Sequence, residues 1–204
     1  MKTTTLFRLS GLATIIGGVG FAIGEILIAI FFPESLPFSQ RFAGLGLAVV
    51  EALEIPALIL LLLGTIGLYI HQQKASGTFG FIGFLLAFIG TVWSIGEGWT
   101  SAFLFSGLSS AVPQFLDSLI IDPPTMAAIG VGLGFILFPL GWILFSVATL
   151  RSKVFSRWSG VLVIVGVLLI PFLPIIANLL LGAGWSWMGY SVWATARTGE
   201  QASE

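Results

Sequence analysis

The sequence predicts an all-α protein, a polytopic transmembrane helical bundle, from its composition and from the way its apolar runs are spaced. Of the 204 residues 57% are hydrophobic and only 8% are charged, and the mean hydropathy is +1.08. Soluble domains carry about 25% charged residues. Several runs reach the length of about 20 apolar residues that one bilayer crossing needs. We therefore expect residues 1–204 to form a single transmembrane domain of six helices.

The first three helices are expected at about residues 11–32, 42–70 and 78–105. The first follows a short polar start, and its apolar run of about 22 residues exceeds the 7 to 15 of a signal-peptide core, so we expect it to be retained. Pro56 removes a backbone donor and should kink the second helix. A polar connection at residues 71–77 separates the second helix from the third.

The longest polar stretch, residues 106–125, is expected to contain a short interfacial helix at about 112–121. Pro113 follows two serines, and proline at the first helical position after serine is a favourable helix start. The mixed polarity of the segment suits a membrane interface. A fourth transmembrane helix at about 126–150 follows, with a kink expected at Pro139.

The last apolar segment permits two interpretations. In the first, two helices at about 158–176 and 179–196 are each just long enough to cross. In the second, the bundle has five helices plus an interfacial C-terminal segment, with an aromatic belt formed by Trp185, Trp187, Tyr190 and Trp193. Arg197 favours six helices, because it then lies on the same side as the other basic loops.

Basic residues predict the orientation. If the helices alternate, one side of the membrane holds Lys2, Arg8, Lys74, Arg151, Lys153 and Arg157. The opposite loops hold only Arg41, together with Glu34, Asp117 and Asp122. The positive-inside rule then makes the amino terminus cytoplasmic in a multi-pass protein of the cell (plasma) membrane. The basic loops would meet anionic membrane lipids.

Composition also excludes several classes of function. A net charge of −1 does not suggest a nucleic-acid partner. The absence of cysteine excludes disulfides and thiol chemistry, and the single histidine, His71, argues against sites that need several histidine ligands. No motif implies a cofactor, and no catalytic residue is predicted.

Three segments contain patterns typical of helix junctions and of a last span. They are Arg8-Leu-Ser-Gly-Leu, the pair GWILFSVATLRS (141–152) and RWSGVLV (157–163), and GWSWMGYSVW (184–193). These segments resemble uncharacterised bacterial multi-helix integral membrane protein families of unknown function. The resemblance implies a helical membrane fold and mildly favours six helices, and it supplies no activity.

Four glutamates within the apolar runs are the strongest pointer to function. The candidate ligand-binding or ion-binding residues are Glu25, Glu51, Glu54 and Glu97, with Trp93 and Ser101 four residues to either side of Glu97. Ionisable residues inside spans are rare and usually face the bundle interior or a wet cavity. At about 1.5 Å per residue, the expected topology puts all four in one layer about 10 to 18 Å below the outer surface.

Burial and mutual repulsion disfavour four ionised carboxylates without a cation. The layer therefore suggests proton-carrying groups, a pocket for an organic cation beside Trp93 or Trp99, or a hard-metal site. The candidate metal ligands are Glu51, Glu54 and Glu97. The alternative is structural, since a protonated glutamate can hydrogen-bond to a neighbouring helix and contribute only to packing.

The function best supported is cation or proton binding, or transport, at this carboxylate layer. An alternative is a non-catalytic accessory or scaffold subunit of a membrane complex. Its docking faces, which would equally serve a homo-oligomer, are the small-residue stripes of Gly20 and Gly24, and of Gly130 and Gly134. A third hypothesis is a membrane-embedded lipid-modifying enzyme with paired carboxylates as acid and base. It ranks last because no nucleophile–base pair is visible.

Overall fold

The protein is all-helical throughout the residues that its computed structural model describes, which are 3–33 and 35–201, with side chains for 4–33 and 35–196. The long helices are α1 (Thr3–Phe31), α3 (Gly46–Trp99), α6 (Thr125–Ser152), α7 (Arg157–Leu169) and α8 (Pro174–Gln201). Four short helices are α2 (Phe38–Arg41), the π-helix η1 (Thr100–Phe105), α4 (Ser106–Ala111) and α5 (Pro113–Ile121). Three of the charged groups used to predict the orientation lie outside the described part of the chain: Lys2, Glu34 and the side chain of Arg197.

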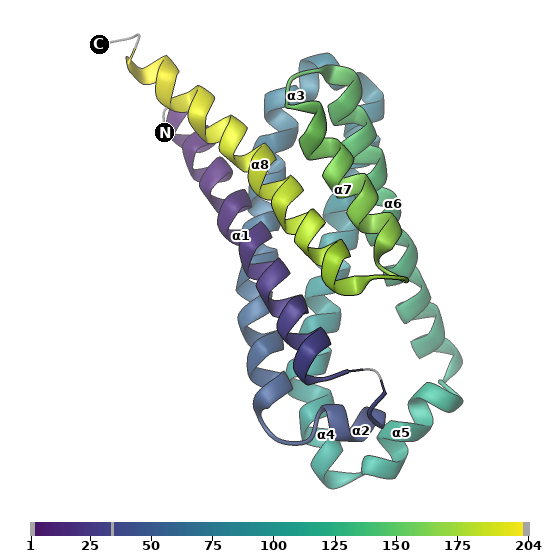
Figure 1. Cartoon of the computed structure of the whole chain (residues 1–204). Helices are drawn as coiled ribbons and strands as arrows, with labels where there is room; N and C mark the ends of the chain where they lie inside the picture. The colour runs from purple at the N-terminus through teal and green to yellow at the C-terminus, as the bar shows by residue number, and fades with distance from the viewer. Residues whose placement is uncertain (1–2, 34, 202–204) are drawn as a thin grey trace.

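The long helices lie side by side in an elongated bundle whose two ends differ (Figure 1). At one end, the terminal end, α1 begins, α8 ends and the 152–157 loop turns. The other end, the cap end, is closed by α2, α4 and α5. α1 packs against both α3 and α8, α6 packs against α3 and α7, and α7 packs against α8, so the helices surround a common core.

The long α3 consists of two helical arms, residues 46–76 and 78–99, that meet at Gly77. Gly77 has φ 56° and ψ −152°, a conformation that essentially only glycine adopts. The arms fold back on each other, because Tyr69 in the first stacks on Phe84 in the second with ring centroids 4.5 Å apart. The polar connection expected at 71–77 is therefore mostly helical, since one glycine suffices to reverse the chain.

Several helix boundaries differ from those expected. α1 includes the polar start from Thr3, because no proline or glycine interrupts residues 3–10 and Ser10 is buried against Gly67. α3 continues through Pro56, and α6 continues through Pro139. The second arm of α3 runs on into η1 and α4 beyond its expected end at residue 105. The interfacial helix expected at 112–121 corresponds to α5.

The last apolar segment is divided at residues 170–173, earlier than expected. Pro174 occupies the first position of α8, where a missing backbone donor is tolerated. α7 has 13 residues and is therefore about 20 Å long, short of a hydrocarbon core of about 30 Å. The α7–α8 turn lies part-way along α6 and does not reach the cap end (Figure 1).

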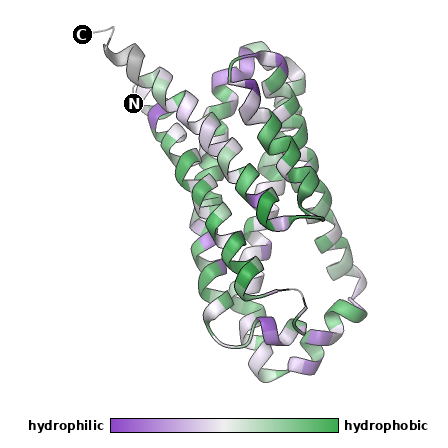
Figure 2. Ribbon diagram, viewed as in Figure 1, coloured by the Kyte–Doolittle hydropathy of each residue, from purple (hydrophilic) through white to green (hydrophobic). Residues whose placement is uncertain are grey.

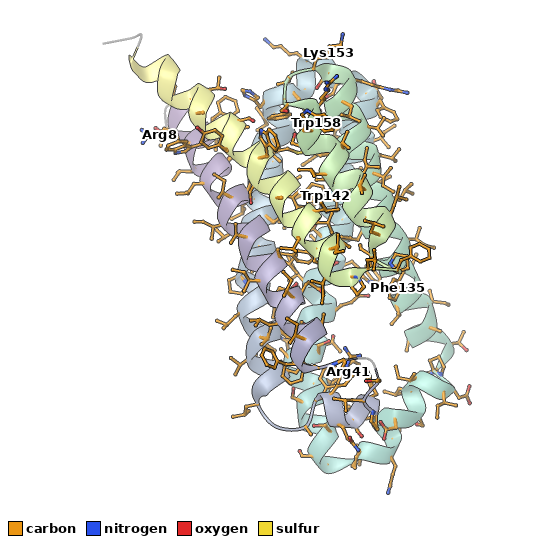
Figure 3. The ribbon with its side chains drawn as sticks, in the orientation of Figure 1. Arg8, Arg41, Phe135, Trp142, Lys153 and Trp158 are labelled. Carbon is orange, nitrogen blue, oxygen red and sulfur yellow. The ribbon has the colours of Figure 1, made fainter. Side chains whose placement is uncertain are left out.

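The core of the bundle is aromatic. The rings of Trp142 and Trp185 lie 4.8 Å apart, and both side chains are fully buried. Trp142 projects into the middle of the bundle (Figure 3). Trp185, which the five-helix interpretation placed in an interfacial belt, is therefore a core residue. A second, smaller core of Phe42, Leu47 and Leu116 fills the cap end.

Hydrophobic residues predominate along the helices of the bundle (Figure 2). Three helical segments are long and apolar enough to cross a membrane: Thr4–Phe31, Gly46–Ala111 and Thr125–Ser152. Large apolar side chains such as Phe135 (73% exposed) and Met126 (80%) cover the exterior of α6. These features indicate a membrane-embedded protein and confirm the all-helical class.

Candidate functional site

Glu54 is the most enclosed of the four glutamates. It lies on the first arm of α3, is 5% exposed, and faces α1. Its Oε2 atom lies 2.9 Å from the point that a β-carbon on Gly24 would occupy, so the missing side chain of Gly24 makes room for the carboxyl. Oε2 has no hydrogen-bond partner. A buried carboxyl oxygen without a partner is unusual, because most buried polar atoms are hydrogen-bonded.

Glu25 connects this region to α8. It is half-buried on α1, and the side-chain amide of Asn178 donates a 3.3 Å hydrogen bond to its Oε2 atom. Glu25 is close enough to Glu51 and Glu54 for electrostatic repulsion to act between the ionised forms. Asn178 was not predicted as a site residue, although an amide inside a 39-residue apolar segment is the signal that would have found it.

Glu51 faces the second arm of α3. It is half-buried, and its Oε2 atom lies 3.5 Å from the β-carbon position of Gly98. Arg41 of α2 attracts it electrostatically. The Nε atom of Arg41 donates a 3.1 Å hydrogen bond to the carbonyl of Phe32, which holds the guanidinium near the end of α1 (Figure 3). We call Glu25, Glu51, Glu54 and Asn178 the carboxyl cluster.

Glu97 points in a different direction from the carboxyl cluster. Its carboxyl is exposed and contacts Gly134 of α6, with Trp93 as its side-chain hydrogen-bond partner. Adjacent helical residues point about 100° apart, so Gly98 faces Glu51 while Glu97 faces α6. Ser101 lies in η1, where its carbonyl accepts a 3.4 Å hydrogen bond from Ser106. Trp99 is 56% exposed and packs on Phe103.

Each of three helix interfaces therefore carries a glutamate against a glycine. Glu54 contacts Gly24 between α3 and α1, Glu51 contacts Gly98 between the two arms of α3, and Glu97 contacts Gly134 between α3 and α6. Gly20 of α1 also packs inside the bundle, against α3, because its β-carbon position lies 2.8 Å from the β-carbon of Ala57. Gly130 has only Trp93 nearby, at 3.9 Å.

The cap end covers the carboxyl cluster. On α5, the Asp117 carboxylate accepts hydrogen bonds from the Ser39 backbone N–H (2.7 Å) and hydroxyl (2.9 Å) of α2. The rings of Phe38, Phe42 and Phe105 pack within 4.9 to 5.5 Å of one another. Asp117, which entered the sequence analysis only as an acidic residue of the opposite loops, thus ties α2 to α5.

The geometry limits the ligands that the glutamates can share. Within residues 3–33 and 35–201, no group of three or more His, Asp or Glu side chains is arranged to hold a metal ion. In particular, Glu97 is turned towards α6, whereas Glu54 faces α1 and Glu51 faces the second arm of α3. The arrangement of Glu25, Glu51 and Glu54 suits a proton shared among neighbouring carboxyls.

No protein-family model, curated protein or solved structure matches the chain.

Proposed function

We propose that the protein binds protons at the carboxyl cluster and that this binding belongs to a small transporter-like or channel-like activity. The observation that carries the proposal is the Glu54 carboxyl, which is buried with Oε2 unpartnered and has Glu25 and Glu51 as electrostatic neighbours. Carboxyls close enough to repel one another when ionised stabilise a shared proton, because several like charges in a low-dielectric site are unfavourable.

The unpartnered oxygen also separates this proposal from a purely structural role. A glutamate that serves only packing should make its hydrogen bonds to the neighbouring helix, as Glu25 does with Asn178. Glu54 is more deeply buried than Glu25 and leaves Oε2 without a partner. This is the pattern expected of a group that exchanges a proton or holds a water molecule.

The proposal includes a topology. The six helices are α1, the two arms of α3, α6, α7 and α8, with the amino terminus and the terminal end cytoplasmic. Lys153 and Arg151 at the terminal end support this orientation through the positive-inside rule (Figure 3). α7 and α8 form a hairpin that enters from the cytoplasmic side and turns within the membrane, which suits the exposed apolar side chains of Phe172 (76%) and Leu173 (49%).

Protons would reach the carboxyl cluster from the outer face, beneath the cap. Arg41 is the basic residue that acts electrostatically on Glu51, and it lies where α2 meets the end of α1. A cation near one carboxylate stabilises its ionised form, so Arg41 would help the cluster to release a proton towards the outer face.

The test is proton uptake by the full-length protein in liposomes that carry an internal pH-sensitive dye. We expect the double variant Glu25→Gln, Glu54→Gln to lose uptake after an imposed pH gradient. Glu97→Gln is the matched control, because its carboxyl faces α6, and it should keep uptake. Infrared spectroscopy of the same samples should show loss of protonated-carboxyl bands only in the double variant. Uptake and bands that survive the double substitution would remove the proposal.

A further inference from the structure

A second group of buried and half-buried polar side chains lies nearer the terminal end, between α3 and α6. We call it the inner polar cluster: Gln72, Ser76, Ser146, Thr149 and Ser152. Gln72 and Ser146 are fully buried, and Thr149 is 1% exposed. None of the five residues carries a charge, and the function proposed above does not use them.

Hydrogen bonds within the inner polar cluster are incomplete. The Gln72 Oε1 atom is approached by the hydroxyls of Thr149 (3.0 Å) and Ser152 (3.4 Å). The Gln72 Nε2 atom and the hydroxyls of Ser76 and Ser146 have no partner. An amide nitrogen carries two donors, and each hydroxyl carries one. Several buried donors therefore lie within one region of the α3–α6 interface without acceptors.

Helix geometry places these unpartnered groups near one another. Ser146 precedes Thr149 by three residues on α6, so both lie on the face that meets Gln72. Ser76 follows Gln72 by four residues on α3, and its hydroxyl lies beside Gly80, whose β-carbon position is 3.7 Å from the β-carbon of Ala148 on α6. A buried donor without an acceptor is costly, and polar interior sites of this kind hold water molecules that make two to four hydrogen bonds.

Four aromatic rings separate the inner polar cluster from the carboxyl cluster. We call Phe21, Phe138, Trp142 and Trp185 the aromatic plug; its ring centroids lie 4.8 to 6.4 Å apart. Phe21 precedes Glu25 by one helical turn, and Trp142 precedes Ser146 by one turn, so the plug adjoins both clusters.

The plug does not need water of its own. Trp142 donates a 3.3 Å hydrogen bond to the Thr91 hydroxyl. The Trp185 N–H has no oxygen or nitrogen acceptor, but the rings of Phe21, Phe138 and Trp142 surround that side chain, and an aromatic face can accept an N–H.

We propose that the inner polar cluster binds water and forms the cytoplasmic half of a proton route that the aromatic plug closes. This inference rests on the proposed function, and it adds a path between the carboxyl cluster and the cytoplasmic side of the membrane. A proton moves along the bound waters and the serine and threonine hydroxyls, each oxygen accepting one proton and releasing another, so only O–H bonds form and break. Gln72 holds the water and keeps its own protons.

The first test is independent of transport. Water-edited NMR of the ¹⁵N-labelled full-length protein in lipid nanodiscs reports which side-chain N–H groups lie next to water. We expect transfer from water to the Gln72 amide, assigned by its loss in Gln72→Leu, and none to the Trp185 N–H. Exposed Gln73 is the positive control. A Gln72 amide without water transfer would overturn the inference, whatever the carboxyl cluster does.

The second test addresses the plug. Phe21→Ala frees far more than the volume of one water molecule, and it should raise proton entry from the cytoplasmic side by about tenfold or more. Adding Gln72→Leu should remove that gain. Phe21→Leu, a milder change, covers the case in which Phe21→Ala does not fold. Unchanged proton entry in a folded Phe21 variant would contradict the role of the plug. Normal proton uptake in the glutamate variants would contradict only the proposed function.

Discussion

The Oε2 atom of Glu54 lies 2.9 Å from the β-carbon position of Gly24, on a different helix. Real β-carbons do not approach a heavy atom so closely, so any larger residue at position 24 must displace the carboxyl. The contact makes the residue type at one position of α1 depend on a side chain of α3. It also means that the carboxyl can be moved without changing Glu54 itself.

Gly24→Ala should therefore leave the protein less stable than a Gly→Ala change at an open helical position, by about 1 kcal/mol or more, because the new methyl group displaces the Glu54 carboxyl. Unfolding of the purified protein in increasing SDS measures the change. Gly132→Ala is the matched control: the added β-carbon meets nothing within 4 Å, and alanine is the better helix former by up to about 1 kcal/mol. Equal stability of the two variants would show that the Glu54–Gly24 contact does not constrain the fold.

The Asn178–Glu25 hydrogen bond should couple α8 to α1. A double-mutant cycle with Asn178→Ala and Glu25→Ala should give a coupling energy of about 0.5 to 2 kcal/mol, the range measured for side-chain hydrogen bonds between membrane helices. SDS unfolding again provides the four stabilities. Additive effects of the two substitutions would mean that the 3.3 Å contact contributes nothing to the folded state.

Gly77→Ala should strain the bend between the arms of α3. With φ 56° and ψ −152°, the position lies in a region essentially restricted to glycine, and the strain is about 1 to 3 kcal/mol. The midpoint of thermal unfolding should fall accordingly. Gly107→Ala, at a helical position where an added β-carbon meets nothing within 4 Å, should leave the midpoint unchanged or raise it. A similar midpoint for Gly77→Ala would show that the bend tolerates side chains.

The helical class could be predicted because it depends on local properties of the chain. Long apolar runs act within one segment, and so does Pro113, where α5 begins. The two serines before it do not cap α5, because they belong to α4 and the N-cap residue is Val112. The position of the break in the last apolar segment was harder to predict, because Pro171 and Pro174 each permit one. Only the packing of α7 on α8 selects the turn at 170–173.

The direction of each glutamate could not be read from the sequence. The spacing of Glu51 and Glu54 predicts a shared helical face, yet Glu51 meets Gly98 and Glu54 meets Gly24, because each carboxyl enters the space beside a nearby glycine. Glu97 turns towards Gly134 for the same reason. Such directions depend on which helices become neighbours, and one sequence does not specify those neighbours. Asn178 entered the carboxyl cluster in the same way.

The early turn between α7 and α8 gives the molecule unequal cross-sections. Between that turn and the cap α1, the two arms of α3 and α6 continue, whereas α7 and α8 run beside them only nearer the terminal end (Figure 1). In the topology proposed above, a bilayer would give up more lipid area in one leaflet than in the other. Lipids that fill the narrower half would touch the exposed side chains of Phe172 and Leu173 directly. The packing of acyl chains in that leaflet would therefore affect the stability of the α7–α8 turn.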